Sequence, residues 1–473
     1  MHGKRLVMSL MLAAAFVAPA HAAETGEARF RSLYKELVET NTTASVGSCT
    51  LAAERMAARL RAAGYPDSDL TLFSAPEYPR EGGLVAVYHA KDPKAKAILL
   101  LAHIDVVEAK REDWTRDPFK LVEENGNFYA RGASDDKAEA AIWVDTLIRM
   151  REEHFTPKHT IKMALTCGEE GGSRFNGAEW LVQNRRDLIE ASFAINEGGS
   201  GELDASGKPV SMTVEAGEKT FQNYRLEITN PGGHSSRPLK DNAIYRLSAA
   251  LTRLSAYEFP IQLADGSKAY LLGMAKVQER QGHADVAAAM RAIVANPQDT
   301  AAVSLVSGRD PSWAAMLHTT CVATMLEAGH ATNALPQRAR ATVNCRIFPG
   351  VTPPQVRDTL QGVVADAGVK VDLIEPMGVS APAPALTPAV LGPVEKLTEE
   401  FWPGVPVLPV LQSGATDGRY LNAVDIPTFG IEGVFMGPDL GHIHGLNEYI
   451  GVDSLLKGRE FMYRLVKIYA EQP

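Results

Sequence analysis

Helix-like and strand-like hydrophobic patterns alternate along the first part of this chain, and this alternation limits the folds that the chain can adopt. Apolar residues recur at helical spacing in 28–39, 51–63, 138–151 and 176–188, and short apolar runs typical of strands occupy 84–89, 97–102, 160–166 and 192–196. Such a regular order is typical of βαβ units around a mostly parallel sheet. The sequence therefore predicts an α/β domain.

The pattern changes after Glu197, where a Gly-rich stretch leads into a different order of elements. Strands are expected at 224–228, 321–327, 340–347 and 370–373, and helices at 243–257, 284–295 and 354–367. Strand, helix, two strands, helix, strand is the split βαβ order of a ferredoxin-like α+β domain. The stretch 261–318 is longer than this plan needs, so we interpret it as an elaboration of the inserted domain.

The first pattern returns after a stretch rich in proline and alanine, 376–388, which is typical of a linker. A helix at 389–398, strands at 405–411 and 427–430, and a helix at 452–470 then resume the α/β domain. We therefore predict an α/β domain in two parts, 23–218 and 379–473, interrupted by an inserted α+β domain at 219–378.

The first 22 residues have the features of a secretory signal peptide. Lys4 and Arg5 precede the apolar stretch 6–17, which is too short to span a bilayer, and Ala20-His21-Ala22 is a small-x-small cleavage site. A buried N-terminal helix is the alternative. We expect export, to the periplasm if the source is bacterial, and no lipid anchor, because no cysteine follows the cleavage site.

Removal of this segment takes away two basic side chains and no acidic one, so the formal net charge changes from -9 to -11. An acidic protein of this kind argues against nucleic acid or an anionic membrane as the main partner, since both attract a basic surface.

Four cysteines remain, Cys49, Cys167, Cys321 and Cys345, and their spacing matches no zinc-knuckle pattern. If the strands around Asn333 pair as a hairpin, Cys321 and Cys345 lie equally far from its centre and face each other. An exported protein could join them, and two reduced core cysteines are the alternative, which counting of free thiols decides. Cys167 is expected to be a small buried side chain.

Five short motifs with acidic or histidine residues follow apolar runs that are widely separated in sequence. They are His103-Ile104-Asp105, Ser134-Asp135-Asp136, Glu169-Glu170, Asn196-Glu197 and His444-Gly445. Charged groups at the strand ends of an open α/β sheet lie in the crevice where such folds bind ligands. Each motif alone is more typical of solvated surface charge, but five of them in one α/β pattern indicate a site.

The residue types in these motifs suit a two-metal hydrolase. Amide hydrolysis needs an activated water, a polarised carbonyl and a proton donor, and two divalent metals about 3.5 to 4 Å apart can provide the first two. Adjacent side chains of extended chain point opposite ways, so one glutamate of the Glu169-Glu170 pair can bind metal while the other moves protons. We assign the general base to Glu169, and to Asp105 a hydrogen bond that orients His103.

Six blocks of the sequence resemble the successive signatures of the aminoacylase, carboxypeptidase S and carnosinase family of di-zinc metallohydrolases, which also includes acetylornithine deacetylase and succinyl-diaminopimelate desuccinylase. The blocks are Leu101 to Asp105, Ala130 to Lys137, Gly168 to Gly172, Asn196 to Gly199, Gly232 to Pro238 and His444 to Glu448. The resemblance implies a zinc-binding α/β domain with an inserted lid or dimerisation domain, and two Zn²⁺ ions that Co or Mn could replace.

The resemblance also implies roles for the ligands. Asp135 would bridge the two metals, His103 and Glu197 would complete one site, and Glu170 and His444 the other. The bond from Asp135 to Asp136 would be a cis peptide. The Gly-x-Asn-Glu sequence after His444 favours it over His442 as the ligand.

Further residues of the family pattern concern the substrate. His234 would donate a hydrogen bond to the carbonyl oxygen in the transition state, sometimes across a dimer, and a turn histidine that only caps a helix is the alternative. Arg346 would bind a free carboxylate, for which a structural salt bridge is the alternative. Asn333, Gly414 and Thr416 match other positions that contact the substrate.

The sequence therefore predicts an exported zinc exopeptidase that acts on dipeptides or on short peptides with a free C-terminal carboxylate. The alternative is an N-acyl-amino-acid amidohydrolase, which a panel of dipeptides and acyl amino acids would distinguish. A non-catalytic binding protein on a hydrolase fold is a remote third possibility, because every ligand and the base are present. A homodimer through the inserted domain would fit the same family pattern.

Overall fold

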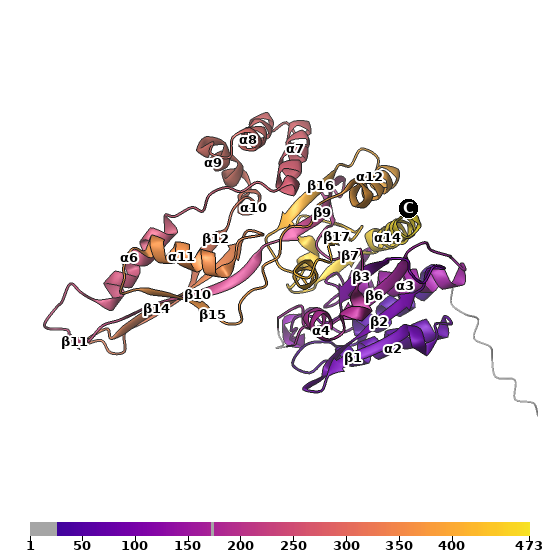
Figure 1. Ribbon diagram of the computed structural model, residues 1–473, viewed down its shortest axis with the longest axis horizontal. Coiled ribbons are helices and arrows are strands. Elements are labelled where there is room, and N and C mark those ends of the chain that lie inside the picture. The colour runs from indigo at the N-terminus through magenta and orange to yellow at the C-terminus, as the bar shows by residue number, and fades with distance from the viewer. Residues whose placement is uncertain (1–25, 172–174) are drawn as a thin grey trace, which may run out of the picture.

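The computed structural model describes residues 26–171 and 175–473, so the predicted signal peptide, 1–22, lies outside the described residues. Within the described residues, no helix combines the length and the apolar character needed to cross a membrane. The chain forms a globular α/β body and a long arm that projects from it (Figure 1). We call the arm the lid, and it is built around strands that lie between Thr220 and Ile374.

The body contains a ten-stranded mixed sheet in the order β1-β2-β6-β3-β7-β17-β9-β8-β18, with β16 paired to β9. The strands β6, β3, β7 and β17 at its centre are parallel, as predicted for this domain. The ten strands are β1 (Leu70–Ala75), β2 (Tyr78–Tyr88), β3 (Ala97–His103), β6 (Thr160–Thr166), β7 (Phe193–Asn196), β8 (Gly201–Leu203), β9 (Pro209–Glu218), β16 (Val407–Gln412), β17 (Thr428–Gly430) and β18 (Phe435–Met436).

Helices cover both faces of this sheet, and the central strand β3 shows why. All seven of its residues are buried. Leu100 packs into the core on one face of the sheet, and the adjacent residue, Leu99, packs into the core on the other face. Successive side chains of a strand point to opposite faces, so an entirely apolar strand needs cover on both. The first face is covered by α1 (Gly26–Glu39), α2 (Cys49–Ala62), α3 (Lys137–Glu152), α12 (Pro388–Phe401) and α14 (Val452–Glu471), and the second by α4 (Gly177–Asn184) and α13 (Gly418–Asn422).

The lid has the ferredoxin-like order predicted from the sequence. Its antiparallel sheet has the order β12-β14-β10-β15, with two helices that share its core. The elements are β10 (Thr220–Thr229), α6 (Ala243–Ser255), β12 (Thr320–Ala328), β14 (Arg338–Ile347), α11 (Pro353–Val364) and β15 (Lys370–Ile374). A two-stranded sheet of β11 (Gly233–His234) and β13 (Ala334–Leu335) lies at the far end of the lid (Figure 1). The predicted fold class is confirmed.

The stretch 261–318 corrects one expectation. It forms four helices, α7 (Asp265–Arg280), α8 (Ala284–Ala295), α9 (Thr300–Arg309) and α10 (Pro311–Ala315). Their core includes Leu408, Val410 and Leu411 of β16, and Figure 1 shows α7 beside that strand. These helices therefore extend the body of the molecule rather than the lid sheet, because their apolar side chains pack on β16.

Both cysteine pairs are disulfide-bonded. Cys321 and Cys345 are direct register partners on β12 and β14, and the predicted bond between them is present. The second disulfide joins Cys49, at the start of α2, to Cys167, directly after β6. Cys167 is buried as expected, but the expectation that it acts only as a small apolar side chain is wrong, because Cys49 lies within bonding distance.

Candidate metal centre

Asp135 lies at the centre of the predicted ligand set. Its Oδ1 lies 3.0 Å from His103 Nε2, and its Oδ2 lies 3.1 Å from His444 Nε2. His444 Nε2 also lies 2.8 Å from Glu170 Oε2, and His103 Nε2 lies 3.7 Å from Glu197 Oε2. The structure therefore places one histidine and one further carboxylate on each side of Asp135, which is the arrangement that a bridging ligand requires.

Three of these side chains come from neighbouring strands of the central sheet. His103 ends β3, Glu170 follows β6, and Glu197 follows β7. The strands β6, β3 and β7 are adjacent and parallel, so their carboxyl ends meet at one edge of the sheet. These three residues therefore lie at strand ends of the main sheet, as the sequence predicted.

Asp135 and His444 reach the site in a different way. They lie in loops beside a small separate sheet made of β4 (Val122–Glu124), β5 (Asn127–Tyr129) and β19 (Tyr449–Gly451). The expectation that every motif follows a strand of the main sheet is therefore wrong for these two. The predicted cis peptide between Asp135 and Asp136 is present.

A buried ion pair holds the loop that carries Asp135. Arg131 Nη1 donates to Glu448 Oε2 at 2.7 Å, and both side chains are almost fully buried. The Glu448 carboxylate also accepts hydrogen bonds from the backbone N–H groups of Gly132, Ser134 and Asp135. A carboxylate with this many donors fixes the backbone around Asp135.

Asp105 connects His103 to the loop after β6. His103 Nδ1 lies 3.1 Å from the backbone oxygen of Asp105 and 3.5 Å from its Oδ1. The two carboxylate oxygens accept the backbone N–H groups of Glu169 and Glu170 at 3.3 and 3.1 Å. Asp105 therefore orients the ring mainly through its carbonyl, while its carboxylate holds the two glutamates.

Glu169 is the carboxylate that has no ligand position in the predicted set. Burial, together with the nearby Glu197, raises the pKa of Glu169 well above its usual value. A carboxyl group with a raised pKa is suited to accept and return a proton near neutral pH. Arg419 Nη1 lies 4.0 Å from Glu169 Oε1 and is the one basic side chain that ion-pairs with this group among the described residues.

The charges of the cluster fit a pair of divalent cations. The acidic residues Asp135, Glu169, Glu170 and Glu197 are largely buried and face two histidines. Burial alone would raise the pKa of Asp135, but hydrogen bonds from His103 and His444 hold that pKa below its usual range. Nitrogen and carboxylate oxygen donors of this kind are ligands that zinc accepts, and bound cations would offset the buried negative charge.

The donor atoms are also close enough to share ions. Ligand atoms of His103, Asp135 and Glu170 lie within 4.8 Å of one another, and so do those of His103, Glu169 and Glu197. His442, the neighbouring candidate, instead points its Nε2 to Asp439 at 3.3 Å. The geometry thus brings His444, and not His442, to Asp135.

The predicted substrate residues separate into two groups. Arg346 of β14 is half-buried at the base of the lid, where its Nη1 donates to the Ser413 carbonyl at 3.4 Å, next to Gly414. Thr416 Oγ1 accepts a hydrogen bond from Asn196 Nδ2 at 3.1 Å, so Thr416 lies beside the Glu197 strand end. These three residues lie around the junction of lid and body.

His234 and Asn333 lie together elsewhere, at the end of the lid. The carbonyl of Asn333 accepts the N–H of Ser235, and β11, which contains His234, is far from the central sheet (Figure 1). His234 is exposed, and its Nδ1 accepts the N–H of Ser236 at 3.1 Å. Within one chain, then, His234 does not meet the cluster around Asp135.

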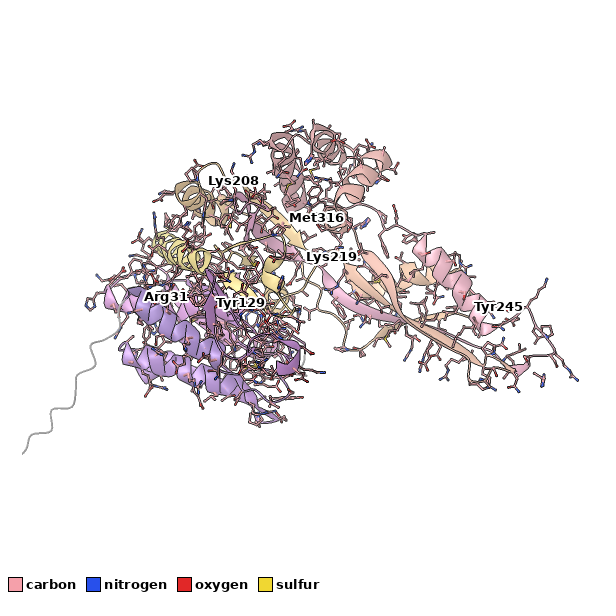
Figure 2. All side chains as sticks on the ribbon, turned by 180° about the vertical axis from the view of Figure 1, so that it is seen from behind. Arg31, Tyr129, Lys208, Lys219, Tyr245 and Met316 are labelled. Atoms are coloured by element: carbon pink, nitrogen blue, oxygen red, sulfur yellow. A yellow bond between two sulfur atoms is a disulfide. The ribbon has the colours of Figure 1, made fainter. Side chains whose placement is uncertain are left out.

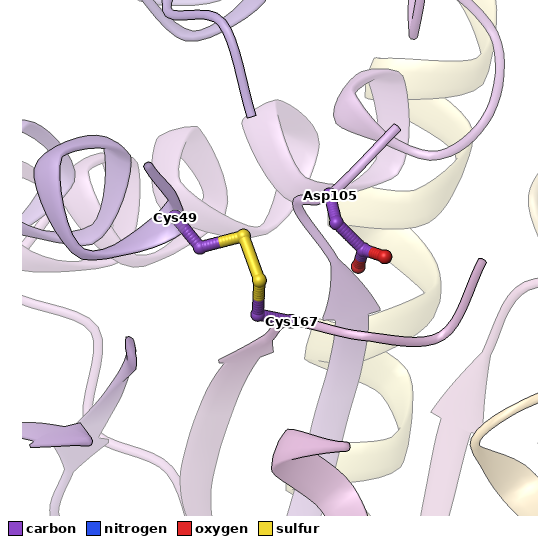
Figure 3. Close-up of side chains that lie close together, drawn as sticks. All are labelled: Cys49, Asp105 and Cys167. Carbon is purple, nitrogen blue, oxygen red and sulfur yellow. A yellow bond between two sulfur atoms is a disulfide. The ribbon is translucent and has the colours of Figure 1, made fainter. Parts of the chain in front are cut away.

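The Cys49–Cys167 disulfide lies beside Asp105, whose carboxylate holds the backbone of Glu169 and Glu170 (Figure 3). Sulfur atoms of this pair and a carboxylate oxygen of Asp105 fall within 4.8 Å of one another, but the disulfide leaves no thiolate to bind a metal. Sequence reasoning missed this bond and the Arg131–Glu448 pair. Arg131 and Glu448 both lie within motifs that the sequence analysis identified. Each is a charged residue in an otherwise apolar or Gly-rich context, and this was the sequence signal that could have revealed the ion pair.

A mixed α/β body, an inserted ferredoxin-like lid and a buried carboxylate–histidine cluster define the class of two-domain metallohydrolases. The chain belongs to Peptidase family M20/M25/M40, whose family model matches residues 99–468. Human N-fatty-acyl-amino acid synthase/hydrolase PM20D1 is 28% identical over 411 residues, which cover 85% of this chain and 80% of the relative. Rat aminoacylase-1A is 27% identical over 401 residues, which cover 82% and 84%.

Solved structures show the same fold. The M20 family metallo-carboxypeptidase Sso-CP2 from Sulfolobus solfataricus superimposes with a TM-score of 0.67 at 18% identity, covering 93% of this chain and 99% of the other. The shared architecture includes both the body and the lid.

Proposed function

We propose that this protein is a zinc-dependent hydrolase of the amide bond in N-acyl amino acids, with two ions held around Asp135. The cluster in which each oxygen of Asp135 faces a different histidine carries this proposal. The sequence alone favoured an exopeptidase first. The relatives that cover most of this chain, among them an N-fatty-acyl-amino acid synthase/hydrolase and an aminoacylase, favour the acyl-amino-acid substrate instead.

Each residue of the cluster has a role in this proposal. Asp135 would bridge the ions, His103 and Glu197 would hold one, and Glu170 and His444 the other. When bound, two such ions supply an activated water and a polarised carbonyl. Glu169 Oε accepts a proton from the attacking water and delivers it to the leaving amide nitrogen, for which its raised pKa is suited.

The lid would recognise the amino-acid half of the substrate. Arg346 is half-buried at the lid base and offers a planar guanidinium that can bind a carboxylate through two hydrogen bonds. Gly414 lies beside it, and Thr416 lines the same side of the site. His234 would donate to the oxyanion, and because it lies at the end of the lid, we propose that it comes from a second copy of the chain in a homodimer.

We also propose that the protein is exported and that residues 1–22 are removed. All four cysteines are paired in disulfides, which persist in oxidising compartments such as the periplasm. Sequencing of the mature N-terminus from the exported fraction tests this, since the chain should begin at Ala23; an intact Met1 in a cytoplasmic fraction would contradict it.

A variant of the base tests the reaction. Glu169→Gln keeps the size of the side chain but cannot accept a proton, so hydrolysis of N-acyl amino acids should fall by about 10²- to 10⁴-fold while two ions per chain stay bound. Activity should be measured together with metal content, and a chelator should abolish the wild-type activity. Full activity in this variant would contradict the assigned role.

A peptidase that removes a C-terminal residue is the second candidate, because the fold neighbour Sso-CP2 is a metallo-carboxypeptidase and Arg346 suits either substrate. Matched pairs such as N-acetyl-leucine and alanyl-leucine separate the two activities. They share the free carboxylate and differ in the group on the scissile carbonyl.

A further inference from the structure

An apolar pocket of about 270 Å³ opens next to the metal centre on the Glu170 side. Most of its lining surface is apolar, and the Cys49–Cys167 disulfide forms part of its wall. Its acidic lining residues are Glu81, Asp105, Glu108 and Glu170. The volume is close to the lower end of the range, about 300 to 1,000 Å³, that small-molecule sites occupy. None of the roles assigned above uses this pocket.

Two links hold part of the wall of the pocket in place. Thr43 forms a parallel bridge with Val106, and the disulfide ties the start of α2 to the residue after β6. The turn at Gly47 is packed so closely that a Cβ there would come within 2.4 Å of the Thr43 backbone nitrogen. The part of the wall held in this way needs no ordering when a ligand enters, which lowers the entropy cost of binding.

The charges around the pocket indicate which half of the substrate it can take. Among the described residues that line it, Arg80 is the single cation, and this side chain is exposed, with its Nη2 donating to the Ser45 carbonyl. A carboxylate in the pocket would lie among the four acidic lining residues and would be strongly disfavoured. The cation suited to a carboxylate, Arg346, lies at the lid base beside Ser413 instead.

We propose that this pocket is the subsite for the apolar acyl chain of the substrate. This inference rests on the proposed function and adds the substrate class, N-acyl amino acids with a medium-length hydrocarbon chain. With the scissile carbonyl at Asp135 and the carboxylate at Arg346, the acyl chain leaves the centre past Glu170 and lies between Ala44, Val106 and the disulfide. Each methylene that enters should raise kcat/KM about three- to fourfold until the pocket is full.

The test uses N-acyl-alanines with acetyl, butyryl, hexanoyl, octanoyl and decanoyl chains. Ala44→Phe and Val107→Phe each place a ring in the pocket, and Ala301→Phe makes the same change as Ala44→Phe at an exposed position of α9. The wild type and Ala301→Phe should prefer the longer chains. The two filled variants should lose about tenfold or more in kcat/KM on octanoyl-alanine and stay within about twofold on acetyl-alanine.

A binding measurement separates this inference from the proposed reaction. Titration calorimetry with the uncharged probe 1-octanol should show binding to the wild type and to Glu169→Gln, and weaker binding to the two filled variants, whose folding is checked by thermal unfolding. An unchanged preference for chain length and unchanged 1-octanol binding in both filled variants would overturn the pocket assignment. If the protein hydrolyses only peptides but still binds 1-octanol in the pocket, the proposed reaction is overturned and the pocket remains an apolar subsite.

Discussion

Glu448 shows how a single residue outside the ligand set can control the site. Its carboxylate accepts hydrogen bonds from Arg131 and from three backbone N–H groups that lead to Asp135. Glu448→Gln replaces one acceptor oxygen by a donor and leaves the buried charge of Arg131 without the negative charge that balances it. We expect a loss of about 3–5 kcal/mol in unfolding free energy and about 10- to 100-fold weaker metal binding. Thermal unfolding and metal titration measure the two effects.

The matched control is Glu124→Gln, which removes the partner of Arg116 in an exposed ion pair. That change should cost less than about 1 kcal/mol and leave metal binding unaltered, because water replaces the lost partner. Equal effects of the two substitutions would show that Glu448 does not organise the loop around Asp135.

Lys219 gives the protein a pH dependence of stability. The side chain is buried where the chain passes from the body to the lid (Figure 2). Burial, with repulsion from Arg346, lowers the pKa of Lys219 to about 7, whereas an unfolded lysine titrates near 10.4. Between pH values of about 7 and 10.4, Lys219 is protonated in the unfolded chain and neutral in the folded protein. The free energy of unfolding therefore rises with pH in this range because of Lys219.

Lys219→Met should therefore stabilise the protein more at pH 7.5 than at pH 9.5, because it removes the cost of keeping the lysine neutral at the lower pH. The gain should shrink by about 1 kcal/mol for each pH unit across this range. Melting temperatures at both pH values measure it, with Lys370→Met at an exposed position of β15 as control. Parallel wild-type and variant curves would contradict the lowered pKa.

At the scale of elements, the two disulfides should have different consequences. The Cys321–Cys345 bond joins neighbouring strands of the lid, and the Cys49–Cys167 bond ties α2 to the segment that leads to Glu169 and Glu170. Replacing either pair by alanines should cost about 2–5 kcal/mol. Only the Cys49/Cys167 double variant should also lose catalytic activity, since its bond borders the cluster. Unfolding curves and kcat measure this, and equal losses of kcat would refute it.

Elements that depend on local pattern could be predicted from the sequence. The strand β3 is apolar along its length, which places His103 at a strand end, and the lid strands pair in the predicted register at Cys321 and Cys345. The bond between Cys49 and Cys167 could not be predicted, because the two residues are 118 positions apart and meet only where α2 packs on the sheet. The Arg131–Glu448 ion pair could not be predicted for the same reason, because the two residues are far apart in sequence and meet only in the folded protein.

At the scale of the whole molecule, periodicity in 261–318 predicted only the helix 284–295, which is α8, and it did not predict the surface on which this stretch packs. The four helices α7 to α10 share a core with β16 of the body, although their sequence lies inside the segment that forms the lid. Asp135 and His444 were found through their motifs, since their loops belong to no strand end of the main sheet. Arrangement in space therefore had to come from the structure.

The lid carries an exposed apolar edge, and we propose that this edge pairs with a second copy of the chain. The strand β12 lies at the edge of the lid sheet, and the side chains of Val322, Met325 and Leu326 are 59%, 69% and 65% exposed. Such an edge is a template for strand pairing, and twofold pairing would join two lids. Leu326→Lys should therefore yield monomers in sedimentation experiments, while Leu272→Lys, at an exposed leucine of α7, should not.

Mixing two inactive variants tests whether the dimer completes the site. His234→Ala and Glu169→Gln should each be nearly inactive alone, because every site in either homodimer lacks one of the two groups. After subunit exchange, each mixed dimer has one site with an intact Glu169 and His234 of the partner subunit. Random exchange should then restore about a quarter of the wild-type activity. No recovery, with exchange verified by native mass spectrometry, would mean that His234 serves its own chain or has no catalytic role.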